Sequence, residues 1–232
     1  LHFKTKNYKS FYDEVDFSMV PARKQTGLDY SIQTEKIGAK KYQGLSSAVI
    51  YGPNASGKTN LIGAMEAMRA IVLRGNIKDA DTVSSPNQAA YILELIPNCN
   101  AKDEPVSFGI RFLEQGLVFD YSFSAMLGNF LDKEYKRAVV GETLRINEKL
   151  VFDRNQDGLF LDTPNVIKKH VNPTFSKNLD AALDIALNSL SDEELFLCNG
   201  FKSIFSKDLF SILLNWFEKR LIVIYRSDAV VA

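Results

Sequence analysis

Apolar and polar positions change their spacing several times along the chain, and each change predicts a different element. Residues 1–20 alternate in two short stretches around a polar turn at Lys9 and Ser10, which predicts two short strands. Residues 21–44 are polar and contain three glycines, which predicts a mobile loop. The short apolar run at residues 48–51 then predicts a buried strand.

The second part of the pattern begins with a helix. Apolar side chains recur at helical spacing over residues 58–73, and Gly75 follows as a stop signal. From 90 to 162 the period becomes two, with turn residues between the runs, which predicts an antiparallel meander of hairpins. Beyond Pro173 the spacing is helical again, and the apolar run at 220–225 predicts a second buried strand.

Composition narrows the class of protein. A chain of 232 residues that is 46% hydrophobic easily buries a core. Its 28 basic and 28 acidic residues leave no net charge to attract nucleic acid or an anionic membrane. Cys99 and Cys198 are too few and too far apart for a disulfide framework or a zinc site, which fits a reducing compartment. With no apolar run of about 18 residues and no signal-peptide core, we expect a cytoplasmic protein without a membrane partner.

One motif carries specific chemistry. The stretch GPNASGKT, residues 52–59, satisfies the G-x-x-x-x-G-K-[ST] pattern of a phosphate-binding loop. Its glycines let consecutive backbone N–H groups wrap a phosphate, and the helix that begins near Gly57 directs its positive end at the same anion. Lys58 would reach the β and γ phosphates, and the Thr59 hydroxyl would ligate Mg²⁺. A predicted strand before the loop and a helix after it supply the context that the motif requires.

The other residues that hydrolysis requires are harder to find. A phosphate-loop enzyme also holds its Mg²⁺ with an aspartate that follows a second apolar strand. Asp120 ends an apolar run but lies within the hairpin pattern, and Asp228 comes three residues too late after its run. Neither satisfies the pattern. Trp216 and Phe217 lie on the apolar side of a predicted helix, which favours a place in the core over stacking on a base.

Five segments together resemble a known family. In chain order they are KNYKSFYDEVDFSM, IYGPNASGKTNL, SFGIRFLEQGLVFDYSF, GETLRINEKLVFDR and SILLNWFEKRLIVI. Their order and spacing resemble the N-terminal part of bacterial AAA family ATPases with an ABC-type head, of the abortive-infection or phage-defence type, which are similar in turn to SMC heads. The resemblance implies an α/β fold: a P-loop NTPase of ABC-ATPase-like type with an antiparallel β-hairpin subdomain and a helical segment.

The resemblance also implies a domain organisation and a set of site residues. It divides one ATPase head into an N-terminal lobe at 1–89, a β subdomain at 90–165 and a helical segment at 166–232. Thr59 would ligate Mg²⁺, and Gln88 is the nearest candidate for the family's second Mg²⁺ contact. The residues that would bind ATP are Lys9, Ser10, Gly52, Pro53, Asn54, Ala55, Ser56, Gly57, Lys58, Thr59 and Asn60.

For function, the resemblance implies an ATPase whose heads dimerise on ATP and control an effector, either a separate protein or a C-terminal domain. The family's signature motif, Asp-Glu strand end and switch histidine would fall after Ala232, so we expect this chain alone to bind ATP without efficient hydrolysis. Two alternatives stay open: an SMC-like head of a DNA-repair or chromosome ATPase, and a nucleotide-sensing module without turnover. Contact with nucleic acid remains possible in each case.

Overall fold

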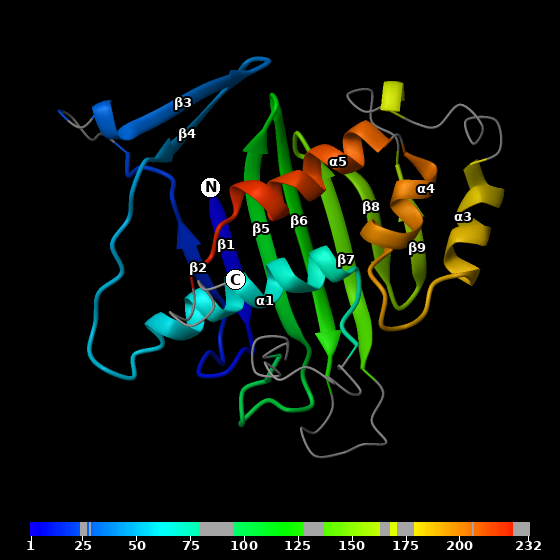
Figure 1. Cartoon of the computed structure of the whole chain (residues 1–232), viewed down its shortest axis with the longest axis horizontal. Coiled ribbons are helices and arrows are strands. Elements are labelled where there is room, and N and C mark those ends of the chain that lie inside the picture. Colours follow the sequence, from blue (N-terminus) through cyan, green and yellow to red (C-terminus); the bar gives the residue numbers. More distant parts are fainter. Residues whose placement is uncertain are drawn as a thin grey trace.

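The structure, a computed structural model, forms two layers. It describes residues 1–23, 27, 29–78, 95–127, 137–162, 168–170, 179–205 and 207–224. A seven-stranded antiparallel sheet has the order β2-β1-β5-β6-β7-β8-β9, and helices α1 and α5 lie across one of its faces (Figure 1). The strands are β1 (His2–Lys6), β2 (Val15–Ser18), β3 (Ile32–Ile37), β4 (Lys40–Leu45), β5 (Val106–Glu114), β6 (Leu117–Met126), β7 (Ala138–Ile146), β8 (Lys149–Asn155) and β9 (Gly158–Leu161).

The helical layer comprises α-helices and short 3-10 and π turns. Among the described helices, none is long and apolar enough to cross a membrane. The helical elements are η1 (Asp29–Ser31), α1 (Lys58–Arg74), η2 (Lys168–His170), α3 (Leu179–Asn188), η3 (Leu197–Phe201), α4 (Lys202–Ile204), α5 (Lys207–Asn215) and η4 (Trp216–Arg220).

The β-meander confirms the period-two pattern over its described part. Side chains of β5 alternate between buried and half-buried positions, as expected for a sheet with one face on the core. Gln115 and Gly116 join β5 to β6 in a two-residue turn, and both have positive φ, 49° and 73°, as a tight hairpin turn requires. The beginning of the predicted meander, residues 90–94, lies outside the described residues, and 95–96 belong to no strand.

Helix α1 confirms both the predicted helix and its stop. Its buried side chains, which include Leu61, Met68 and Ile71, recur at three- and four-residue spacing and join the core. The helix ends at Gly75, whose φ of 75° is left-handed and whose N–H donates to the carbonyl of Ile71 at 2.8 Å.

Aromatic side chains join the C-terminal helices to the sheet. Trp216 stacks on Phe112 of β5 with ring centroids 3.9 Å apart, and Phe217 meets the same ring edge-on. Arg69 of α1 donates from Nε to the Phe217 carbonyl at 3.0 Å, which ties α1 to η4. These contacts confirm the core assignment of Trp216 and Phe217.

A buried carboxylate joins the sheet to the segment that begins η3. Glu142 of β7 accepts backbone N–H groups from Phe196 at 2.7 Å and Leu197 at 2.9 Å, and the Tyr121 hydroxyl at 2.9 Å. Arg154 lies 3.8 Å from the same carboxylate. Burial raises the pKa of Glu142 although all four partners act to lower it. The carboxylate therefore holds the two layers together at a cost in desolvation.

The sequence prediction of a mobile loop over residues 21–44 is wrong for most of its second half. Most of the second half of this segment forms a hairpin, in which β3 pairs with β4 from Ile32–Leu45 to Ile37–Lys40. Gly38, with φ of 59°, takes the first central position of the turn, where a type II′ turn needs a glycine. Glu148 in the β7–β8 turn binds Lys40 and holds the hairpin against the main sheet. The two strands show no period-two alternation of buried and exposed side chains, so the pattern of apolar residues gave no sign of them.

The two predicted buried strands are also corrected. Residues 48–51 form no strand, and the side chains of Val49 and Tyr51 are 84% and 90% exposed. Likewise, residues 221–224 form no strand, and Ile222 is 76% exposed. A buried strand needs hydrogen-bonded neighbours, and no described strand pairs with either segment. Apolar composition alone therefore did not determine their conformation.

Candidate functional site

The predicted phosphate loop lies on the surface at the start of α1. Gly52 through Ser56 are exposed, and the chain enters the helix after Gly57. The Lys58 ammonium donates to the carbonyls of Gly52 at 2.7 Å and Pro53 at 2.6 Å. The lysine thus closes the loop on itself by binding the carbonyls at its beginning.

The backbone of the loop fits an anion. Gly57, the residue before the helix, has a left-handed φ of 90° and provides no side-chain cap, so the first-turn N–H groups of α1 depend on another acceptor. Ala55 is also left-handed, with φ of 64°, a strained conformation for a residue with a side chain. A Cβ on Gly52 would lie 3.0 Å from the Ser56 Oγ. A side chain at Gly52 would therefore crowd the loop, and the left-handed φ of Gly57 favours glycine there.

The turn after β1 packs against the same loop. Ser10 Oγ accepts a hydrogen bond from Asn60 Nδ2 at 2.7 Å. A Cβ on Gly57 would come within 2.8 Å of the Phe11 ring, so that ring rests directly on the glycine. Sequence reasoning included Ser10 and Asn60 but missed Phe11, although an aromatic residue directly after the polar Lys9-Ser10 turn is a visible signal for packing.

The remaining predicted ligands are distributed unevenly around the loop. Thr59 is exposed in the first turn of α1, where its hydroxyl would reach a metal bound beside a phosphate. The Lys9 ammonium lies over the Tyr8 ring, 5.5 Å from its centroid. Gln88 and Asp228 lie outside the described residues. Among the residues that the structure places, no group of three or more His, Cys, Asp or Glu side chains could hold a metal ion.

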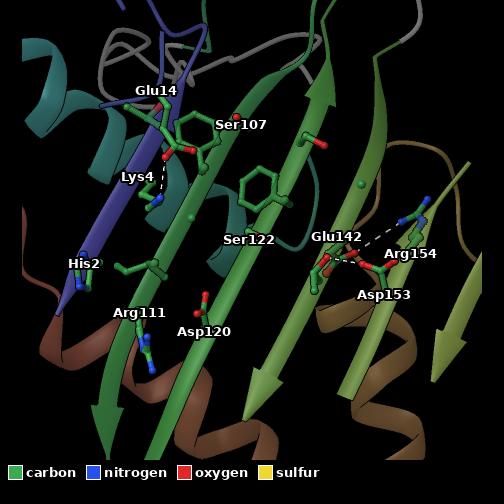
Figure 2. Close-up of a pocket in the computed structure, with 18 of the residues that line it drawn as sticks. His2, Lys4, Glu14, Ser107, Arg111, Asp120, Ser122, Glu142, Asp153 and Arg154 are labelled. Atoms are coloured by element: carbon green, nitrogen blue, oxygen red, sulfur yellow. Dashed lines mark hydrogen bonds and ion pairs between the residues drawn. The ribbon is translucent and has the colours of Figure 1, made fainter. Parts of the chain in front are cut away.

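A hollow of about 690 Å³ lies away from the phosphate loop, on the sheet face that carries no helix (Figure 2). Asp120 lies on this face, at a mid-strand position of β6, and so is not the magnesium aspartate of the phosphate loop (Figure 2). At the two sides of the hollow, Lys4 donates to Glu14 at 2.6 Å and Thr143 donates to Asp153 at 2.5 Å. Because these groups are already paired with one another, the phosphate loop remains the stronger candidate site.

Replacing Gly57 by alanine should destabilise the loop. The variant adopts a left-handed φ and presses a methyl group against Phe11, so we expect a loss of about 1–2 kcal/mol in the free energy of unfolding. Gly116→Ala is the matched control, because Gly116 also has positive φ but nothing lies within 4 Å of an added Cβ. Urea denaturation would compare them, and equal losses in both variants would contradict a specific contact between Phe11 and Gly57.

Comparison with known proteins identifies the family of the chain. A family model described as "AAA domain, putative AbiEii toxin, Type IV TA system" matches residues 47–221, about three quarters of the chain, and the match begins just before the phosphate loop. Searches of curated proteins and of solved structures gave no match. Because the family model covers well over half of the chain and includes the whole loop, the chain belongs to this family of AAA ATPases of the abortive-infection type.

Proposed function

We propose that this chain is the ATP- and Mg²⁺-binding part of an ABC-like ATPase that controls an effector in bacterial defence against phage. The observation that carries the proposal is the loop at residues 52–59, with Lys58 turned into it and an uncapped helix start behind it. In this proposal the loop amides and Lys58 bind the β and γ phosphates, and Thr59 ligates Mg²⁺. The family match supports nucleotide use by this chain.

The proposed output is a change of assembly. ATP would bring two heads together, and loss of the γ-phosphate would let them separate and so switch the effector. A ligand can drive such a change only through contacts that differ between the two states, and the γ-phosphate is the group that ADP lacks. In this proposal the effector is either a separate protein or another domain of the same protein.

Calorimetric titration of the chain with ATP and Mg²⁺ tests the binding step. We expect saturable one-site binding that requires Mg²⁺ for full affinity, because the metal neutralises part of the triphosphate charge. Light scattering with ATP and with ADP then tests assembly, with a larger mass expected only for ATP. The absence of any ATP binding would refute the proposal, and equal masses with the two nucleotides would refute its dimerisation step.

Nucleotide sensing without turnover is a second candidate. The observation that favours it is the position of Asp120, the described candidate for the magnesium aspartate, which lies on the helix-free face of the sheet (Figure 2). ATP binding combined with an undetectable release of phosphate by this chain would support sensing. Sustained phosphate release that requires Lys58 would support hydrolysis instead.

A further inference from the structure

The turn that touches the phosphate loop is itself held by two buried asparagines. We propose that Asn7 and Asn98 are positioning residues for the nucleotide site, which act by fixing the Lys9–Phe11 turn against the start of α1. The expected effect on ATP affinity rests on the proposed ATP-binding function. The effect on the position of the turn against α1 can be tested without nucleotide.

Asn7 sets the shape of the turn at its beginning. The residue is fully buried and left-handed, with φ of 56°. Its Nδ2 donates to the carbonyls of Ala101 and Glu104, both at 2.8 Å, and its Oδ1 accepts the N–H of Asn98 at 3.0 Å. All three bonds reach residues more than ninety positions away in the sequence. The loop that precedes β5 thus fixes the left-handed conformation of Asn7.

Asn98 fixes the next part of the same turn. Its Nδ2 donates to the Lys9 carbonyl at 2.8 Å, and the Lys9 N–H donates to the Ile96 carbonyl at 2.9 Å. Lys9 is also left-handed, with φ of 49°. Left-handed residues of this kind cost of order 1 kcal/mol each and persist only where their surroundings hold them. The two asparagines supply that support, Asn7 through its own side chain and Asn98 through the Lys9 carbonyl.

Ser10 and Phe11, the two residues after Lys9, connect the turn to the phosphate loop. Ser10 Oγ bonds to Asn60 in the first turn of α1, and the Phe11 ring rests on Gly57. If the turn relaxes, both contacts shift, and the N–H groups at the helix start lose their fixed direction. Supporting residues of this type matter because a site displaced by about 1 Å binds its ligand poorly. The chain of contacts therefore runs from the loop before β5 to the phosphate loop.

The test compares Asn98→Ala with Asn199→Ala. Asn199 donates to the carbonyls of Gly75 and Leu195 at 3.2 Å, so the control removes similar bonds at the opposite end of α1. In the ligand-free protein, hydrogen exchange of the bonded amides of Lys9, Phe11 and Leu61 should be faster in Asn98→Ala and unchanged in Asn199→Ala. The affinity for ATP with Mg²⁺ should fall about tenfold in the first variant and less than twofold in the control.

Asn98→Ser gives a second test if the alanine variant folds poorly. It keeps an acceptor for the Asn100 N–H without burying a charge and loses the donor to the Lys9 carbonyl, so a smaller change in the same direction is expected. Equal exchange of the Lys9, Phe11 and Leu61 amides in the Asn98 variants and the control would overturn the inference, as would faster exchange with unchanged ATP affinity. If the unaltered chain binds no ATP, the proposed function fails, and the exchange comparison alone decides whether the asparagines hold the loop.

Discussion

Lys58→Ala should weaken the binding of ATP with Mg²⁺ by about 100-fold and leave the fold intact. The ammonium would make charge-assisted bonds to two phosphates, and the loss of about 3 kcal/mol for such contacts corresponds to this factor. In the ligand-free structure its partners are the carbonyls of Gly52 and Pro53, on the surface. Because these carbonyls can bond to water instead, the free energy of unfolding should change by less than about 0.5 kcal/mol.

Lys36→Ala is the matched control for the charge. Lys36 is exposed on β3, so its loss changes the net charge equally but leaves the phosphate loop untouched. Calorimetric titration of the three proteins at the same ionic strength separates a specific ligand from a general electrostatic attraction. Equal affinities of Lys58→Ala and the unaltered chain would contradict the role of Lys58, and equal losses in the two variants would indicate general attraction only.

The part of the site that the sequence predicted is the part encoded by local rules. The order of residues 52–59 specifies glycines, a lysine and a helix start within one short stretch, and α1 follows from the spacing of its apolar side chains. Hairpin β5–β6 follows from alternation and a two-residue turn in the same way, whereas the turn at Asn147 and Glu148 between β7 and β8 lies inside a run that the sequence pattern left undivided. Each of these features depends on residues close together in the chain.

The features that the sequence did not predict depend on distant partners. Whether the apolar run 48–51 becomes a strand is decided by a neighbour that can pair with it, and no described strand does. The β3–β4 hairpin is held by Glu148, more than one hundred residues from Lys40. The bonds between Asn7 and the loop around Asn98 likewise leave no periodic trace, because an asparagine before a turn is common in any surface loop.

Glu142→Ala should produce the largest loss of stability among the substitutions considered. It leaves the N–H groups of Phe196 and Leu197 and the Tyr121 hydroxyl without an acceptor inside the protein, and it leaves Arg154 without a nearby carboxylate. Removing one partner from a buried charged network typically costs about 3–5 kcal/mol. Urea denaturation would measure it, with Glu14→Ala as the control, since the exposed Lys4–Glu14 pair should contribute less than about 1 kcal/mol.

The dependence of this loss on pH follows from the raised pKa of Glu142. In the folded protein burial favours the protonated carboxyl, so above the ordinary value of 4.5 the folded state binds more protons than the unfolded chain. The stability contributed by Glu142 is therefore greatest below pH 4.5 and declines as the pH rises through the folded pKa. We expect the difference in unfolding free energy between the unaltered chain and Glu142→Ala to narrow from pH 5 to pH 8. A difference that widens over this range would show that the bonds to Phe196, Leu197 and Tyr121 outweigh desolvation.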